Sequence, residues 1–206
     1  MSVFLIIASL LPFYLLGAFP TGVLISKIYG VDISSQGSGN VGATNVARVV
    51  GKRAGILTLL IDACKGGLGV ALASWIVGEP WFVGGASFAV VLGHCFSIPT
   101  IFKGGKGVAT ALGVITVLLP SSSIVALVVF GAFFGMFRIV SLAAIAATLM
   151  VPMWALVINA SDAVCFSLML IAGLIVMRHE QNIRRLIEGR EPTFHARKDP
   201  SEGPVS

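Results

Sequence analysis

The chain has 206 residues, of which 56% are hydrophobic and only 11% are charged, and its formal net charge is +5. Its mean hydropathy is +0.97. Soluble domains carry roughly a quarter charged residues, so too few charges are present here to cover a water-facing surface. The composition excludes a soluble globular protein and indicates an integral membrane protein.

Apolar segments recur along the chain, and short polar connections separate them. The segments do not alternate with period two, so they predict membrane helices and not barrel strands. In chain order they cover about 3–25, 54–77, 81–101, 108–119, 122–137, 140–158 and 162–177. The fourth segment would extend only about 18 Å as a helix, against a hydrocarbon core of roughly 30 Å. Pro120 closes this segment, so a kinked or partial helix is expected there.

The basic residues are distributed unevenly among the connections. The first, third and fifth connections and the C-terminal tail carry Lys and Arg, whereas GEPW, PSSS and NASD carry none. Basic connections stay in the cytoplasm, which predicts an N-terminus outside and a C-terminus inside. Five helices with re-entrant pieces would give the same sidedness. We expect an all-α protein with about seven transmembrane helices around a cytoplasm-facing pocket.

The C-terminal part is predicted to leave the bilayer. In RHEQNIRRLIEGRE, from Arg178 to Glu191, the apolar residues Ile183, Leu186 and Ile187 fall on one helical face and the arginines on the other. This pattern is typical of a basic helix at the membrane interface. We therefore expect a single membrane-embedded domain over 1–191 and a disordered cytoplasmic tail over 192–206.

The stretch SSQGSGNVGATNVAR after the first segment is small, polar and rich in glycine. Gly37, Gly39 and Gly42 have the G-x-G-x-x-G spacing, but they follow a membrane helix, so a dinucleotide-binding βαβ unit is excluded. Glycines still let backbone N–H groups converge on an anion. Neutral donors and the charge of Arg48 lie nearby, which favours an anion site over a plain turn. The donors are Ser35, Ser38, Asn40, Thr44 and Asn45.

A second polar stretch, HCFSIPTIFKGGKGVAT, places Lys103 and Lys106 among three glycines. It is not a Walker A loop, because no Ser or Thr follows Lys106. Two lysines in a cytoplasmic connection are ordinary, but glycines packed around them indicate a backbone that approaches a ligand. His94 opens this stretch, and the sequence leaves open whether it is a structural group or a catalyst.

Other polar residues have simpler interpretations. Asp62 and Lys65 lie three residues apart in the second segment, where an unpaired charge costs about 2.5–3.5 kcal/mol or more, so mutual pairing is expected. The three cysteines are far apart and indicate neither a disulfide nor a zinc site. Carboxylates are too sparse on the cytoplasmic side for a divalent-metal cage, and no cofactor is expected.

Two catalytic patterns are absent. There is no G-x-S-x-G elbow, and Pro99 stands where the H-x-x-x-x-D pattern of thioester-using acyltransferases would place its aspartate. Many anion donors, few bases and no metal suit substrates that bear phosphate. An anion transporter or channel is the alternative, but the outer connections are short and bland.

Three blocks, GSGNVGATNVAR, HCFSIPTIFKGGKGVAT and RHEQNIRRL, resemble the bacterial acyl-phosphate-dependent glycerol-3-phosphate acyltransferases, and the resemblance covers nearly the whole chain. It implies seven transmembrane helices and acyl transfer from acyl phosphate to the 1-hydroxyl of glycerol 3-phosphate, giving lysophosphatidic acid and phosphate. It also implies a multi-pass protein of the bacterial plasma membrane with a cytoplasmic active site. Contact with the enzyme that makes acyl phosphate is a further expectation, and no nucleic acid is expected as a partner.

The resemblance implies two groups of site residues. The expected catalytic residues are His94, Lys106, Ser35 and His179. The expected phosphate-binding residues are Ser38, Gly39, Asn40, Thr44, Asn45, Arg48, Lys103, Gly104, Gly105, Ser141 and Asn182. The acceptor of the hydroxyl proton stays open between His94, His179 and an oxygen of a substrate phosphate.

Overall fold

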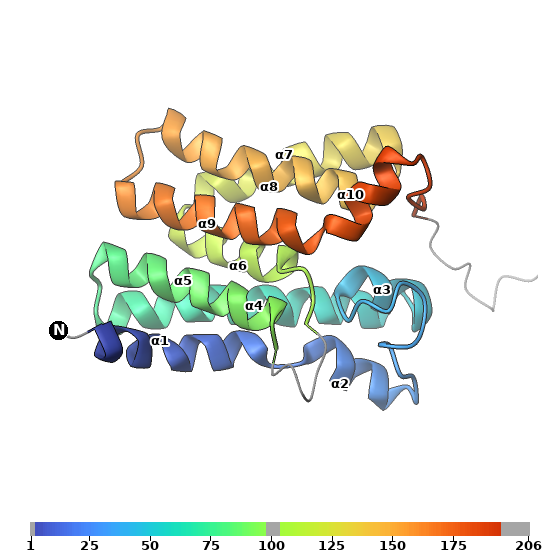
Figure 1. The fold of residues 1–206 in the computed structure, drawn as a ribbon, viewed down its shortest axis with the longest axis horizontal. Helices are drawn as coiled ribbons and strands as arrows, with labels where there is room; N and C mark the ends of the chain where they lie inside the picture. Colours follow the sequence, from blue (N-terminus) through green and yellow to red (C-terminus); the bar gives the residue numbers. More distant parts are fainter. Residues whose placement is uncertain (1–2, 98–103, 195–206) are drawn as a thin grey trace, which may run out of the picture.

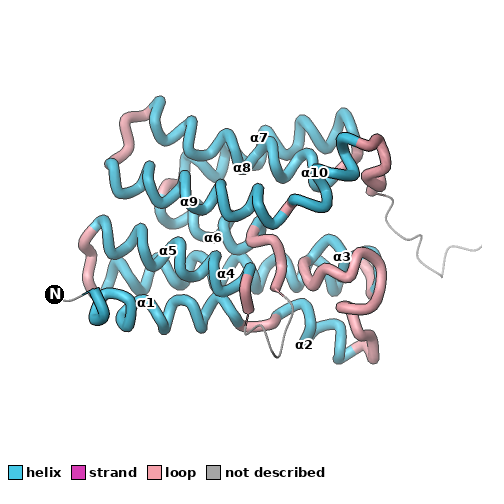
Figure 2. The backbone as a smooth tube through the Cα atoms, viewed as in Figure 1, coloured by secondary structure: helices cyan, strands magenta, loops and turns pink. Residues whose placement is uncertain are grey.

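The structure, a computed structural model, describes residues 3–97 and 104–194. Over these residues the chain forms ten α-helices and no strand (Figures 1 and 2). In chain order they are α1 Val3–Ala18, α2 Thr21–Ile28, α3 Ala43–Val49, α4 Lys52–Ile76, α5 Pro80–Cys95, α6 Val108–Leu118, α7 Pro120–Phe137, α8 Val140–Val157, α9 Asp162–Arg178 and α10 Glu180–Ile187. The predicted all-α fold is confirmed.

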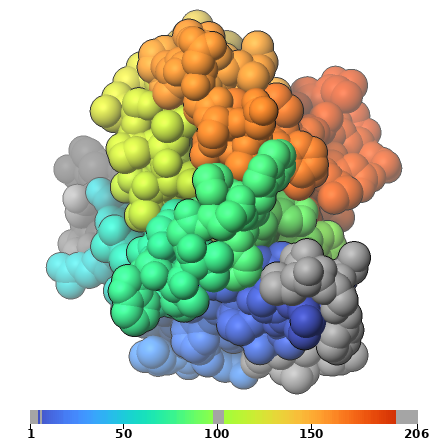
Figure 3. Space-filling view, turned by 90° about the vertical axis from the view of Figure 1, so that its left-hand side faces the viewer, coloured from blue at the N-terminus to red at the C-terminus, as the bar shows by residue number. Residues whose placement is uncertain are grey.

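The long helices lie side by side, so most of the connections between them gather at two opposite ends of the bundle (Figure 1). One end carries α3, α10 and the loop between α2 and α3. The opposite end carries the α4–α5 and α8–α9 connections, and Figure 3 shows the segments around them lying against one another. The first glycine-rich stretch and the basic helix α10 therefore lie at the same end of the bundle, where a shared site can form.

Length and composition identify four candidate membrane spans in the described chain. These are Ile7–Ile28, Lys52–Ile76, Pro120–Phe137 and Val140–Val157, and α9 with α10, bent by 60°, would be a fifth. The helices α5 and α6 are apolar but shorter. Six of the seven predicted segments each correspond to one helix over their described residues, and α6 is as short as expected. The large apolar side chains that face outward, such as Trp75 at 82% exposure, fit a hydrocarbon surrounding.

The first segment was expected to be one continuous helix, and this is wrong. The chain breaks between α1 and α2 at Phe19 and Pro20, because proline has no N–H to donate and its ring clashes with the preceding turn. Two buried side chains satisfy carbonyl groups at the break. Ser97 Oγ donates to Ala18 O at 2.7 Å, and Lys65 Nζ donates to Phe19 O at 3.1 Å.

The expected pairing of Asp62 with Lys65 is confirmed. Lys65 Nζ lies 2.8 Å from Asp62 Oδ1, and both side chains are almost fully buried. The pairing neutralises two charges that would be costly apart within the membrane. Asp62 Oδ1 is also 3.6 Å from His94 Nδ1, so the pair reaches α5.

Glycines let helices approach closely enough for backbone contact. A methyl group on Gly113 would lie 1.8 Å from Ala63 O, and one on Gly66 would lie 2.0 Å from Thr110 O, so α4 and α6 cross without room for a side chain. Gly17 and Gly93 do the same between α1 and α5. Small residues at crossings are the usual means of helix association in membranes. The α4–α6 crossing also fixes the start of α6. It thereby fixes the end of the loop over 104–107, which carries Lys106 and is called the lysine loop below.

Candidate active site

A polar cavity of about 190 Å³ lies at the end of the bundle that carries α3 and α10. Its walls come from the loop before α3, from α3, α4, α7 and the end of α5, from the start of α6 and α8, and from the α9–α10 junction, α10 and the residues after it. The polar residues that line it are Ser38, Asn40, Thr44, Asn45, Arg48, Asp62, His94, Lys106, Ser141, His179, Asn182, Arg185 and Glu191. Stretches that lie far apart in the sequence therefore form one site.

The first glycine loop is shaped by its own side chains. Gly37 and Gly39 have φ values of +60° and +67°, which L side chains rarely adopt. Asn45 is 2% exposed, and its Oδ1 accepts from Ser38 N–H at 3.0 Å while its Nδ2 donates to Gln36 O at 2.9 Å. Asn40 Oδ1 accepts from Gly42 N–H at 2.8 Å. Both asparagines therefore hold the loop as well as line the cavity.

Two cations without a carboxylate partner line the cavity. Among the described residues, no Asp or Glu lies within ion-pair distance of Arg48 or Lys106. Burial lowers the pKa of Lys106 to about 8, and the neighbouring arginines act in the same direction, while Glu191 opposes them. A phosphate would supply the missing negative charge to both groups.

The lysine loop is pressed against the end of α5. A methyl group on Gly104 would lie 2.0 Å from Cys95 O, and one on Gly105 would lie 2.2 Å from His94 Nε2. Gly105 N–H donates to His94 O at 3.0 Å. His94 is thus packed between Asp62 and Gly105 at the cavity wall. Glycine is required at 104 and 105, because any side chain there would clash with the end of α5.

The α9–α10 junction supplies the two polar groups predicted from RHEQN. His179 is 2% exposed, and its Nδ1–H donates to Ile175 O at 2.7 Å. In a neutral imidazole this leaves Nε2 as an acceptor. Asn182 Oδ1 accepts from Lys106 Nζ at 2.6 Å, which joins α10 to the lysine loop.

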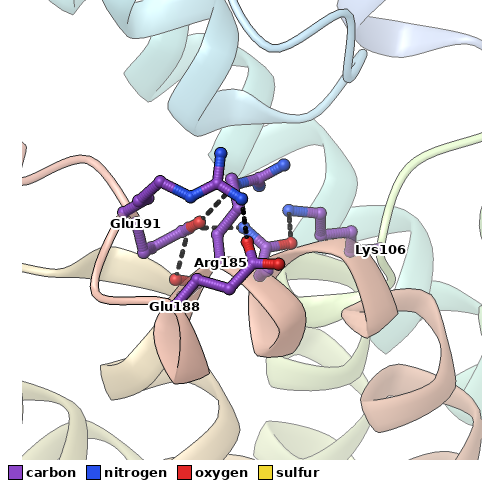
Figure 4. Close-up of polar contacts among 7 residues, drawn as sticks. Lys106, Arg185, Glu188 and Glu191 are labelled. Atoms are coloured by element: carbon purple, nitrogen blue, oxygen red, sulfur yellow. Dashed lines mark hydrogen bonds and ion pairs between the residues drawn. The ribbon is translucent and has the colours of Figure 1, made fainter.

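Glu191 brings a carboxylate into the cavity wall (Figure 4). Its Oε1 accepts from Ser141 Oγ at 2.7 Å and from Asn182 Nδ2 at 2.5 Å, and its Oε2 accepts from Arg185 Nε at 2.6 Å. Burial by itself would raise the pKa of Glu191, but these hydrogen bonds outweigh it and lower the pKa. Glu191 is therefore an anion that ties α8 and α10 together.

The chain after Glu191 then reaches the end of α7, where Phe194 N–H donates to Arg138 O at 2.7 Å.

An apolar cavity of about 220 Å³ continues from the polar one between α6, α7, α8 and α9. Five residues line both cavities, namely Leu59, Val108, Ala109, Phe130 and Ala144. A second polar cavity, of about 410 Å³, adjoins the first on its other side, and Lys106 and Ser38 line both. The site can therefore hold charged groups next to an aliphatic chain.

Comparisons with known proteins agree with this arrangement. The sequence model of the glycerol-3-phosphate acyltransferase family matches residues 6–189. The chain is 46% identical over 187 residues to the glycerol-3-phosphate acyltransferase of Trichlorobacter lovleyi, covering 89% of this chain and 94% of that protein. It is 42% identical over 182 residues to the Aquifex aeolicus protein of the same name, covering 88% and 95%.

Two solved structures are also similar. They are crystal structures of PlsY, an integral membrane glycerol 3-phosphate acyltransferase, in a glycerol 3-phosphate form and a lysophosphatidic acid form. Each is 40% identical to this chain, with TM-scores of 0.87 and 0.86. The alignments cover 92% and 93% of this chain and 96% of each PlsY chain. The chain belongs to the glycerol-3-phosphate acyltransferase family.

The structure gathers most of the predicted residues of this acyltransferase. Ten of them line the polar cavity, namely Ser38, Asn40, Thr44, Asn45, Arg48, His94, Lys106, Ser141, His179 and Asn182. Gly39 and Gly104 line the adjoining polar cavity, and Gly105 contacts His94. Ser35 is exposed, its Oγ donates to Asp32 O at 3.0 Å, and it is not among the lining residues. Lys103 lies outside the described residues.

Sequence reasoning missed three charged residues of the acyltransferase site. Arg178, Arg185 and Glu191 were assigned to an interfacial helix, because a run of charges at a membrane surface looks the same whether it faces lipid or protein. Asp62 was expected only as the partner of Lys65, yet it also lines the cavity. Among the described residues, no group of three or more His, Cys, Asp or Glu side chains could hold a metal ion.

Proposed function

We propose that this enzyme transfers a fatty acyl group from acyl phosphate to the 1-hydroxyl of glycerol 3-phosphate in phospholipid synthesis. The products are 1-acylglycerol 3-phosphate, that is lysophosphatidic acid, and inorganic phosphate. The family is one of glycerol-3-phosphate acyltransferases, and the similar PlsY structures are a glycerol 3-phosphate form and a lysophosphatidic acid form. These are a substrate and a product of this reaction.

The observation that carries the proposal is the junction of a polar and an apolar cavity beside Arg48 and Lys106, for which the described part of the chain supplies no carboxylate partner. Arg48 and Lys106 suit phosphate, while the cavity between α6, α7, α8 and α9 suits the acyl chain. Both substrates carry phosphate, and the two adjoining polar cavities share Lys106. Holding both reactants at one junction supplies proximity, which is a large part of acyl-transfer catalysis.

The chemistry needs no covalent enzyme intermediate. The 1-hydroxyl oxygen attacks the acyl carbonyl carbon, the bond from that carbon to the phosphate oxygen breaks, and inorganic phosphate leaves. Lys106 and Arg48 stabilise the negative charge on the leaving phosphate. The hydroxyl proton goes to His179 Nε2, His94 or an oxygen of a substrate phosphate, and we favour the phosphate because His94 is packed against Gly105. Ser35 belongs to the proposed site only if its loop rearranges on binding.

An anion transporter is not favoured. The family comparisons give an acyltransferase, and the polar cavities lie at one end of the bundle. A transport path would continue as polar groups toward the other end, whereas the cavity that continues from the polar one into the bundle is apolar.

We further propose the arrangement in the membrane. Seven spans with the N-terminus outside place α3, α10 and the cavity in the cytoplasm of a bacterium, with 1–191 as one plasma-membrane domain and 192–206 as a cytoplasmic tail. The positive connections support this sidedness. A cytoplasmic mouth would let the enzyme that makes acyl phosphate deliver it by direct contact.

The decisive experiment is phosphate release by purified protein. Acyl phosphate with glycerol 3-phosphate is expected to give phosphate and lysophosphatidic acid in equal amounts, with little release when glycerol 3-phosphate is omitted. Acyl-coenzyme A is expected to be inert and chelators without effect. Turnover of the thioester at a comparable rate, or activity that is lost in chelator and restored by metal, would contradict the proposed donor and mechanism.

A further inference from the structure

The loop that carries Lys106 has little order of its own. Three of its four residues over 104–107 are glycines, and Gly107 has a φ of +86°. Glycine loses more conformational freedom on folding than any other residue, so external contacts have to hold such a loop. Lys106 nevertheless sits at a defined place, with its Nζ 2.6 Å from Asn182 Oδ1.

Arg178, the last residue of α9, is hydrogen-bonded to the backbone of this loop. Its Nε donates to Gly105 O at 3.2 Å, and one terminal nitrogen donates to Gly104 O at 3.3 Å. The guanidinium also lies over the Phe96 ring, 5.0 Å from its centroid. A planar fork with several fixed donors suits two successive carbonyls, and the aromatic face restrains it further.

The charge of Arg178 is directed to the loop. Within the part of the chain that the structure describes, no carboxylate forms an ion pair with this guanidinium. The end of α5 also leaves no free space beside the loop, because methyl groups on Gly104 and Gly105 would clash with Cys95 O and His94 Nε2. The loop is therefore held both by its packing against the end of α5 and by the hydrogen bonds from Arg178.

We propose that Arg178 is a positioning residue for acyl transfer, which acts through the Gly104 and Gly105 carbonyls to fix Lys106 beside the substrate phosphate. The inference rests on the proposed function for its kinetic consequence. The same α9–α10 junction carries His179 and Asn182, so these hydrogen bonds also set the loop relative to these two groups. Without them, the glycines let Lys106 leave its place, and a misplacement of about 1 Å can cost roughly a hundredfold in rate.

The test compares Arg178→Ala and Arg178→Lys with Arg184→Ala, whose arginine lies on the exposed side of α10. Arg178→Ala is expected to lower kcat/KM for glycerol 3-phosphate by about tenfold to a hundredfold. Arg178→Lys recovers part of this loss, since an ammonium reaches one carbonyl but cannot reproduce the fork. Arg184→Ala stays close to wild type.

Chemical rescue separates positioning from a structural role. Millimolar methylguanidinium is expected to restore activity to Arg178→Ala severalfold, and to leave the lowered activity of Lys106→Ala unchanged because the positioned group itself is gone. Near-normal kcat/KM in Arg178→Ala would overturn the proposal. A loss that neither methylguanidinium nor Arg178→Lys relieves would overturn it as well.

Hydrogen–deuterium exchange gives a readout that does not depend on the reaction. Peptides covering 104–107 are expected to exchange faster in Arg178→Ala, while peptides from α4 keep their protection. Unchanged exchange at 104–107 would show that Arg178 does not hold the loop. If the wild-type protein failed to release phosphate with both substrates, the proposed function would fail, and the exchange result would still decide whether Arg178 holds the loop.

Discussion

At the scale of single residues, the site depends on Arg48 and Lys106, two cations that pair with no carboxylate over residues 3–97 and 104–194. If Arg48 and Lys106 both bind phosphate, either substitution to alanine removes a charge-assisted hydrogen bond, typically worth about 1.5–3 kcal/mol. Steady-state kinetics of Lys106→Ala and Arg48→Ala should then show kcat/KM lowered roughly tenfold to a hundredfold or more. Arg48→Lys should recover part of the loss, because a point charge does not reproduce a two-pronged contact.

Arg190→Ala is the matched control for these variants. Arg190 is exposed and pairs with Glu188 outside the cavity, so its loss should cost little. The competing interpretation is that all these cations only orient the protein in the membrane. Correctly inserted Lys106→Ala or Arg48→Ala protein with near-normal kcat/KM would support that interpretation and refute the phosphate site.

The pKa of Lys106 leads to a separate prediction about pH. Burial lowers this pKa to about 8, so the cation is present below pH 8 and is lost as the pH rises through that value. The second phosphate pKa of the substrate is about 6, so the substrate charge is constant above pH 7. Hence kcat/KM for glycerol 3-phosphate should fall by about tenfold between pH 7 and pH 9, since this ratio reports groups of the free enzyme.

Lys106→Arg tests the origin of that fall, because a guanidinium stays charged throughout the range. Its absolute activity is expected to be lower than that of the wild type, but its kcat/KM should stay flat between pH 7 and pH 9. A fall of equal size in both proteins would assign the pH dependence to another group.

At the scale of helices, the site depends on how closely α4 and α6 approach. Gly113→Ala forces a methyl group to within 1.8 Å of Ala63 O, so the helices have to separate. Overpacking of this kind costs typically about 1–3 kcal/mol. Thermal unfolding in detergent should show a lower Tm, and kcat/KM should fall, because α6 begins directly after the lysine loop.

Gly131→Ala is the matched control on α7. Apart from the adjoining backbone of its own helix, no atom lies within 4 Å of the added methyl group, and alanine is favoured over glycine in a helix by about 0.5–1 kcal/mol. Its Tm should therefore stay the same or rise. An equal decrease in both variants would mean that the loss of glycine, and not the crossing, is responsible.

At the scale of the whole molecule, the proposed orientation can be tested by labelling. Single cysteines are introduced at Ser38 and at Ser161 in a chain whose native Cys64, Cys95 and Cys165 have been replaced. An impermeant thiol reagent added to intact cells should label Ser161→Cys in the α8–α9 connection. Ser38→Cys should react only after the cells are opened. Labelling of both positions from one side would contradict the seven-span arrangement.

The sequence alone determined the membrane class, most of the helices and one buried ion pair of this protein. Composition determined the membrane class, because a low charge content cannot cover a water-facing surface. Seven apolar segments predicted the helices, including the short α6 that ends before Pro120. The Asp62–Lys65 pair also followed from spacing on one helix and from the cost of a lone charge in the membrane.

Local spacing could not decide contacts between distant segments, and there the tertiary structure was needed. It divided the first segment at Pro20, where Lys65 and Ser97 satisfy the freed carbonyls. It showed that Asn45 and Asn40 hold their own loop through hydrogen bonds. It also showed that Ser141 and Asn182 donate to Glu191, which the sequence had placed in an interfacial helix.

The same physical reason explains each of these cases. Residue types and periodicity determine which groups must be buried or satisfied, because those costs arise within one helix or one loop. The partner that satisfies a group such as Glu191 or the Gly105 carbonyl comes from another helix, and only the packing of α5, α9 and α10 decides it.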